Sequence, residues 1–162
     1  MCVTPLNSII EILENDFTDF FEDIEECPPG EWKHFINKKY SIQYPHESNL
    51  TLREFKKRYM RRIENFRKIS ETNSLKKYVL YCEQNNFTVE QLNKIYDILK
   101  IYCKGSPFKF YIVHLFHDIT PKVNLRNLNP AIIFNEYDIS GEIDVGWNER
   151  VINKNILTDI MK

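Results

Sequence analysis

The stretch FKFYIVHLF, residues Phe108 to Phe116, decides the fold class of this chain. Nearly every residue in it is apolar, which is typical of a strand that is buried on both faces of a parallel sheet. Upstream, residues 88–91 (TVEQ) have the form of a capping box and open a predicted helix that ends before Gly105. Further upstream, residues 75–81 (LKKYVLY) have the aromatic and branched composition of a second strand. A strand, a helix and a strand in this order predict a crossover unit with two parallel neighbouring strands.

A second capping box, residues 51–54 (TLRE), opens a predicted helix with two different faces. One face is an apolar stripe that we expect to pack on the core, formed by Leu52, Phe55, Tyr59, Ile63, Phe66 and Ile69. The other positions are strongly basic, namely Arg53, Lys56, Lys57, Arg58, Arg61, Arg62, Arg67 and Lys68. We expect these basic side chains to be largely exposed, with at most one of Arg61 and Arg62 turned inward to meet an acid.

Alternating helices and strands predict an α/β fold, and the length of 162 residues predicts one domain over residues 1–162. The predicted architecture is a single three-layer domain with a mostly parallel central sheet flanked by helices. The remaining predicted elements are one or two helices over residues 5–24, a connector over 32–37, strands over 40–44 and 131–137, and a final helix over 148–161.

Charge and cysteine content limit the classes of function. The formal net charge of −1 gives no global attraction to nucleic acid or to an anionic membrane, and it argues against nucleic acid as a partner. The acids of residues 11–26 and the bases of residues 53–68 are expected to form solvated faces that can pair with one another. No apolar run is long enough to span a membrane. The four cysteines lack zinc-site spacing, which favours a reducing, cytoplasmic compartment and predicts no metal and no cofactor.

Several residues with chemically useful side chains lie at predicted loop positions. His46, followed by Glu47, lies between a strand and a helix, where catalytic side chains are often held. His117 and Asp118 follow a strand at its carboxyl end, where open α/β sheets place their ligands. Each pair also has a simpler interpretation as a hydrogen-bonded loop. His114 lies within an apolar strand and is interpreted as a core histidine. Cysteines 82 and 103 are interpreted as small buried apolar side chains.

Four segments together carry a resemblance to a known family. They are residues 3–21 (VTPLNSIIEILENDFTDFF), 44–47 (YPHE) and 59–66 (YMRRIENF), followed by Trp147. In this order they resemble an uncharacterised family of papain-like cysteine peptidases found in bacteria and large DNA viruses. The resemblance implies that His46 is the family's histidine, that Glu47 stands where an aspartate is usual, and that Arg61 and Arg62 are its paired arginines. The cysteine-bearing N-terminal strand of the family has no counterpart, so the resemblance implies a truncated and catalytically incomplete member.

Three functions follow as hypotheses. The first is a cysteine hydrolase, or a fragment of one, in which His46 would activate a thiol. The second is a non-catalytic module that contacts a protein partner. The third is a phosphate or nucleic-acid binder that uses the basic helix over residues 53–68, with Arg61 and Arg62 able to hold one carboxylate or phosphate.

Overall fold

The computed structural model describes residues 4–27, 34–83, 86–116, 123–138 and 158, and these contain two separate three-stranded sheets. The larger sheet is parallel, with the order β4 (Lys76–Glu83), β5 (Phe108–Phe116) and β6 (Ile132–Asp138). Helix α3 (Val89–Tyr102) lies between β4 and β5 in the chain and begins with the predicted capping box. The predicted strand–helix–strand unit with parallel neighbouring strands is therefore confirmed.

The smaller sheet is antiparallel and was not predicted. Its strands β1 (Ile24–Glu26), β2 (Phe35–Asn37) and β3 (Ile42–Tyr44) have three residues each. The prediction of a connector over residues 32–37 is wrong where β2 lies. The predicted strand over residues 40–44 exists as β3, but it belongs to this sheet and not to the parallel one. Strands of this length are too short to show the period of two on which sequence prediction depends.

The first helix is shorter than predicted. Helix α1 (Leu6–Glu14) ends where Asp16 and Phe17 take φ angles of 47° and 60°, in the left-handed region that cannot continue a right-handed helix. Two side chains from other helices bind this turn. The Tyr102 hydroxyl lies 3.0 Å from Asp16 Oδ1, and Arg67 Nε lies 3.1 Å from the same oxygen. The prediction of one or two helices over residues 5–24 is therefore wrong beyond Glu14, because tertiary hydrogen bonds hold a turn there and residues 15–23 form turns up to β1.

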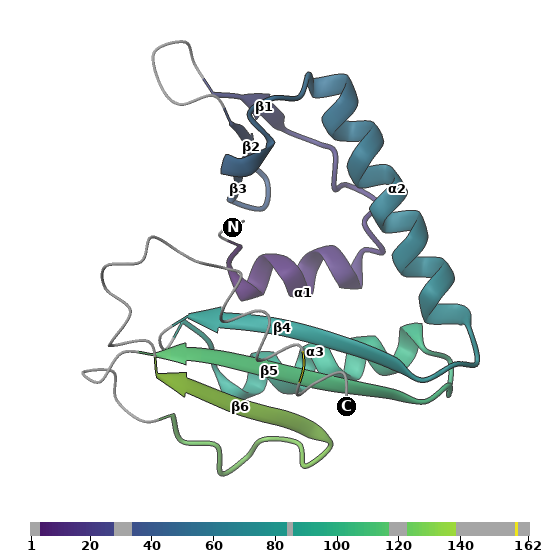
Figure 1. Cartoon of the computed structure of the whole chain (residues 1–162), viewed down its shortest axis with the longest axis vertical. Helices are drawn as coiled ribbons and strands as arrows, with labels where there is room; N and C mark the ends of the chain where they lie inside the picture. Colours follow the sequence, from purple (N-terminus) through teal and green to yellow (C-terminus); the bar gives the residue numbers. More distant parts are fainter. Residues whose placement is uncertain (1–3, 28–33, 84–85, 117–122, 139–157, 159–162) are drawn as a thin grey trace.

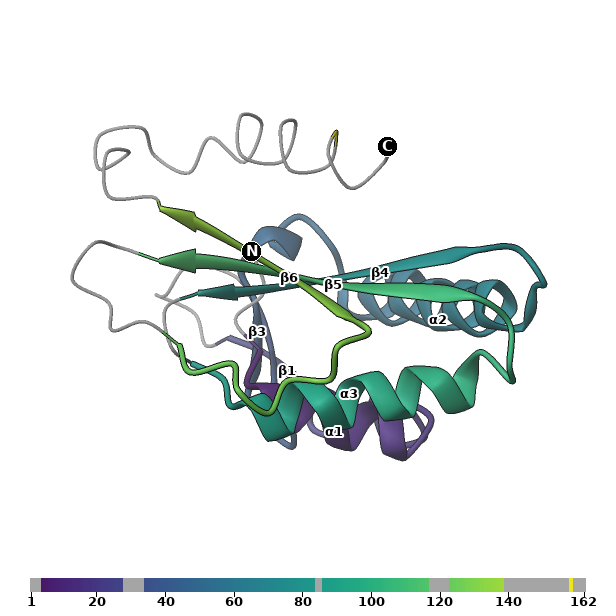
Figure 2. The ribbon, with the colours of Figure 1, turned by 90° about the horizontal axis from the view of Figure 1, so that it is seen from below.

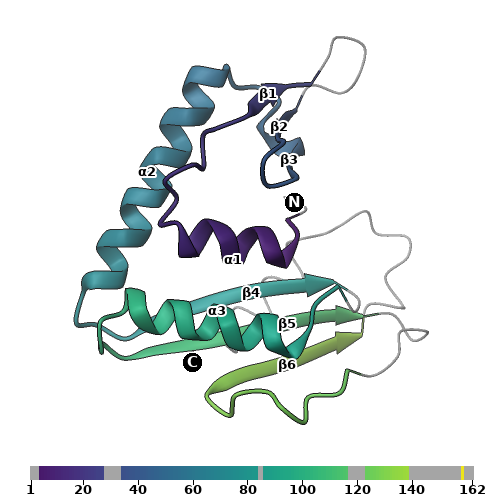
Figure 3. The same ribbon diagram turned by 180° about the vertical axis from the view of Figure 1, so that it is seen from behind.

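Helix α2 (Leu52–Glu71) runs along one edge of the molecule, from the small sheet to the start of the parallel sheet (Figures 1 and 3). Phe55 and Ile63 of the predicted stripe are buried, whereas Ile69 is 55% exposed. A step of seven residues from Ile63 places Ser70 on the inner face, and its hydroxyl lies 2.8 Å from that of Tyr78. The apolar stripe is thus confirmed except in the last turn, where the buried position is 70 and not 69.

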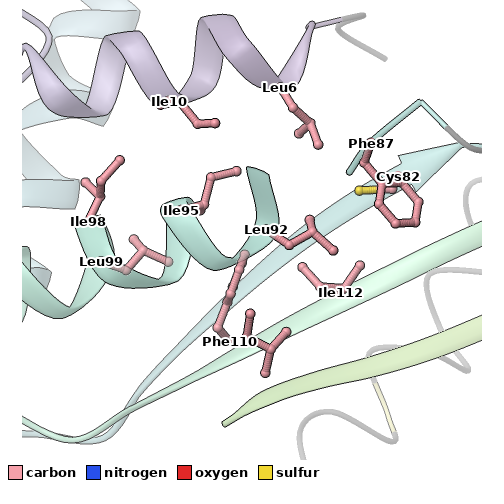
Figure 4. Close-up of a cluster of buried hydrophobic side chains, with 11 residues drawn as sticks. Leu6, Ile10, Cys82, Phe87, Leu92, Ile95, Ile98, Leu99, Phe110 and Ile112 are labelled. Atoms are coloured by element: carbon pink, nitrogen blue, oxygen red, sulfur yellow. The ribbon is translucent and has the colours of Figure 1, made fainter. Parts of the chain in front are cut away.

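The main core lies between the parallel sheet and helices α1 and α3, which are on the same side of the sheet (Figure 2). Figure 4 shows Leu6 and Ile10 of α1 pointing toward α3, with Phe110 and Ile112 of β5 below. The opposite face of β5 is buried as well, since Val113 is 0% exposed, so the prediction for this strand is confirmed on both faces. The three-layer arrangement stays a prediction, because the described helices α1 and α3 cover one face only.

A second core joins α2 to the small sheet. Phe55 packs against Phe35 of β2 and Tyr44 of β3, with ring centroids 4.6 and 4.9 Å apart. In the neighbouring part of the small sheet, Asn37 at the end of β2 is 0% exposed and makes two hydrogen bonds. Its Nδ2 donates to the carbonyl oxygen of Phe20 at 2.8 Å, and its Oδ1 accepts from the backbone N–H of Tyr40 at 3.1 Å. The buried Asn37 amide therefore holds two backbone segments in place, the turn before β1 at Phe20 and the turn between β2 and β3 at Tyr40.

Candidate functional site

The structure separates the two residues that the sequence proposed as a catalytic pair. His46 and Glu47 belong to a short 3-10 helix, η1 (Pro45–Glu47), that precedes α2. The His46 side chain is exposed, whereas Glu47 is 7% exposed and turns toward α2. Glu47 forms an ion pair with Arg58 and lies 3.5 Å from Arg62 Nη1. The described hydrogen bonds of the Glu47 carboxylate therefore go to α2, and none orients the imidazole of His46.

The two adjacent arginines point in different directions. The Arg62 side chain is 53% exposed and bends toward Glu47, and its guanidinium lies 4.7 Å from the centre of the Tyr59 ring, a cation–π distance. Arg61 is exposed and lies about 100° around the helix from Arg62. The prediction that at most one of this pair turns inward to an acid is confirmed. Because they face different ways, Arg61 and Arg62 do not form the joint carboxylate or phosphate clamp that their adjacency suggested.

Five cations remain on the solvent side of α2, and we call them the basic face: Arg53, Lys56, Lys57, Arg61 and Lys68. At 3.6 residues per turn Arg53, Lys57, Arg61 and Lys68 lie on the side away from the buried Phe55 and Ile63, and half-buried Lys56 lies at the margin of this face, near Ile63. Within the described part of the chain none of the five forms an ion pair. Arg53, Lys57 and Arg61 follow one another at steps of four, a spacing at which like charges destabilise a helix by a few tenths of a kcal/mol per pair.

A surface hollow follows this side of the helix. Its volume is about 680 Å³, and its basic lining residues are Lys56, Lys57, Arg58 and Arg61. Met60, which is 45% exposed, is the apolar residue of its lining. All described lining residues come from α2, so the hollow follows the helix. Two carboxylates, Glu54 and Glu64, also line it, so its charge is positive on balance, with four cations against two acids.

The acidic stretch over residues 11–26 does not neutralise the basic face, so the expected pairing of the two stretches is largely wrong. One ion pair joins them, between Asp16 and Arg67, and Arg67 is not on the basic face. The other described ion pairs of this stretch go elsewhere, Glu14 to Lys94, Asp19 and Glu22 to Lys39, and Glu25 to Lys38. The acids of residues 11–26 thus pair mostly with lysines outside the basic helix, whereas the cations of the basic face form no ion pair with a described residue.

The parallel sheet brings together a thiol, an imidazole and a carboxylate. In register across β4, β5 and β6, Cys82 lies beside His114, and His114 lies beside Glu136. His114 is 1% exposed, and its Nδ1 lies 3.3 Å from Glu136 Oε1, so its interpretation as a hydrogen-bonded core histidine is confirmed. Sequence analysis missed Glu136, because only the register of parallel strands places it beside the histidine.

This row of residues lacks an activated nucleophile. The sulfur of Cys82 makes no hydrogen bond to a described residue, and burial raises the pKa of the Cys82 thiol to about 12. A thiol must ionise or transfer its proton to attack a carbonyl. Cys103 is 1% exposed, so the burial expected for both cysteines is confirmed. His114 and Glu136 therefore form a polar pair at the end of the core.

We expect slow alkylation of Cys82 in the folded protein. With its pKa raised to about 12, almost none of the Cys82 thiol is ionised at pH 8, so iodoacetamide has little thiolate to attack. Mass spectrometry should find Cys82 unmodified after a treatment that labels it fully in urea. Half-buried Cys27 provides the internal comparison, since it is expected to react first. Rapid stoichiometric labelling of Cys82 at pH 8 would show that the site activates this thiol.

The other expected site residues are His117 and Asp118. Both, like most of the predicted helix over residues 148–161, lie outside the described residues. The described residues hold no group of three or more His, Cys, Asp or Glu that could bind a metal ion. No helix in the described ranges is long and apolar enough to cross a membrane. Comparison with protein-family models, curated proteins and solved structures finds no match to this chain.

Proposed function

We propose that this protein is a non-catalytic binding module whose basic face contacts a polyanionic partner. The observation that carries the proposal is the set of five cations along the exposed side of α2 without an ion pair to any described residue. Three of them, Arg53, Lys57 and Arg61, repel one another at steps of four. A partner with closely spaced negative charges removes this repulsion and gains attraction from each side chain. The opposite side of α2 is fixed in the cores, so the face is presented on a rigid support.

The resemblance to papain-like cysteine peptidases supports a second proposal, which concerns ancestry. The chain would be a catalytically incomplete relative of that family, and its four cysteines favour a reducing, cytoplasmic compartment. Exposed His46 and the turn of Glu47 toward arginines favour a binding role over hydrolysis. The three-layer arrangement of the whole chain belongs to this proposal too.

The first test of the binding proposal is retention on a heparin column, since heparin is a dense and readily available polyanion. Replacing Arg53, Lys57 and Arg61 together with glutamine should move elution to markedly lower salt. The matched control replaces Lys38, Lys94 and Lys104 with glutamine, three exposed lysines on other elements that are already paired with acids. It loses the same number of positive charges but should elute with the wild-type protein. Equal elution of the two triple variants would contradict the proposal, because net charge alone would then explain retention.

A further inference from the structure

We infer that the polyanion is the sugar–phosphate backbone of a nucleic acid, contacted without reading the base sequence. The inference rests on the proposed function and names its partner. The candidate partners for a cationic helix face are a small phosphorylated molecule, an acidic protein, an anionic membrane and a nucleic acid. The contacts of α2 discriminate among them.

A small phosphorylated molecule does not fit the helix. Such ligands bind where free backbone N–H groups at a helix start converge on the phosphate. In α2 this position is taken, because the Thr51 hydroxyl accepts from the Glu54 N–H at 3.3 Å. The Glu54 carboxylate in turn accepts from the Thr51 N–H at 2.8 Å. A carboxylate already occupies the start of the helix and would repel a phosphate there.

An acidic protein surface fits less well than a nucleic acid. Protein interfaces are held by a central cluster of aromatic and apolar side chains, and lysine is depleted in them. The basic face has two arginines and three lysines, and the only large apolar residue that lines the hollow beside it in the described structure is Met60. It therefore has no apolar centre from which water could be excluded around a protein partner.

A membrane surface is disfavoured by the position of the apolar stripe. A helix that lies in a bilayer interface inserts its apolar side into the lipid. The apolar side of α2 instead packs on the protein cores, where Phe55 is 0% exposed and Ile63 is 6% exposed. Among the large apolar side chains of α2 only Met60 and Ile69 are exposed, and two isolated side chains provide too little inserted surface to anchor such a helix.

A nucleic-acid backbone matches the extent and chemistry of the basic face. From Arg53 to Lys68 the helix advances about 22 Å, at 1.5 Å per residue. Duplex DNA carries one negative charge per roughly 1.7 Å of its axis, so several phosphates lie within reach of five flexible cations. Asn65, four residues after Arg61, is the only asparagine or glutamine of α2, so side chains that pair with adenine edges are few. The contacts are therefore with phosphates, and base sequence has little influence.

The deciding experiment is fluorescence anisotropy with two labelled DNA duplexes of equal length and unrelated sequence, at several salt concentrations. We expect the two dissociation constants to agree within about threefold. The plot of log K against log salt should have a slope of about −3 to −4.5, because each neutralised phosphate contributes roughly −0.9. The variant with glutamine at 53, 57 and 61 should lose at least tenfold in affinity at low salt and flatten the slope by about 2 to 3. The control with glutamine at 38, 94 and 104 should follow the wild-type protein, and circular dichroism should show that both variants keep their helices.

The outcomes separate this inference from the proposed function. Retention on heparin without DNA binding would overturn the nucleic-acid inference and leave the polyanion proposal standing. Binding to vesicles containing phosphatidylserine with an affinity above that for DNA would identify a membrane surface instead. A preference above tenfold for one duplex would refute contact with the backbone alone. Absence of binding to both heparin and DNA would refute both proposals.

Discussion

Replacement of Phe55 with alanine is expected to lower the free energy of unfolding by about 3–5 kcal/mol. Phe55 is 0% exposed and lies among the rings of Phe35, Tyr44 and Tyr59, with centroids 4.6, 4.9 and 4.5 Å away. Alanine removes the ring and leaves a cavity that these neighbours can fill only by moving. Urea denaturation followed by circular dichroism measures the loss, because the midpoint falls while the slope changes little.

The control for this experiment is Met60→Ala on the same helix. Met60 is 45% exposed, so its truncation removes little buried surface and should change stability by less than about 1 kcal/mol. A loss of under 1 kcal/mol for Phe55→Ala as well would show that the second core contributes little to stability. The proposed rigid support of the basic face would then lose its physical basis.

The second large effect is expected at a polar residue. Asn37→Ala should cost about 2–6 kcal/mol, because it leaves the Phe20 carbonyl and the Tyr40 N–H buried without their partner. Each unpaired buried group costs about 1–3 kcal/mol. The measurement is again urea denaturation, with Gln43→Ala, a change at an exposed position of β3, as the control.

A third variant separates hydrogen bonding from packing at this position. Leucine has the same branching and the same number of side-chain heavy atoms as asparagine, although it is bulkier, and it cannot form either hydrogen bond. If Asn37→Leu is as destabilising as Asn37→Ala, the amide acts through its hydrogen bonds. Recovery of wild-type stability by leucine would contradict this interpretation and assign the effect to the lost volume.

The parts of the fold that the sequence predicted are those specified by residues close together in the chain. Both capping boxes lie within four residues, and both form. The run Phe108–Phe116 could be predicted as a strand from its own residues, because a short, almost wholly apolar segment is typical of a strand buried on both faces. Parallel pairing then followed from the helix between the strands. Local patterns of this kind can be recognised without knowledge of tertiary contacts.

The small sheet and the turn after α1 depend on contacts between distant residues. Asn37 looks like a loop residue in the sequence, yet it is buried because the carbonyl of Phe20, 17 positions away, accepts its N–H. Asp16 and Phe17 interrupt a helical pattern because Tyr102 and Arg67 stabilise a left-handed turn. Neither the burial of Asn37 nor the left-handed turn at Asp16 and Phe17 can be predicted from neighbouring residues in the sequence.

The candidate site shows the same division. The basic residues and the exposed side of the helix were predictable from spacing, and Arg61 lies where that spacing puts it. The pairing of Glu47 with Arg58 and Arg62 was not predictable, because it depends on how η1 meets α2. The net charge of −1 likewise does not describe a local surface. It sums over the chain, whereas a binding surface depends on which acids lie beside which bases.

The position of α2 also bears on how cooperatively the protein unfolds. Phe55 and Ile63 belong to the core under the small sheet, while Phe66 packs on the core under the parallel sheet. Helix α1 is divided in the same way, with Ile10 in one core and Ile12 in the other. Neither sheet can lose its helices without exposing part of the other core, so the two cores behave as one cooperative unit. A ligand bound along α2 therefore raises the midpoint of a single thermal transition and does not protect one sheet alone.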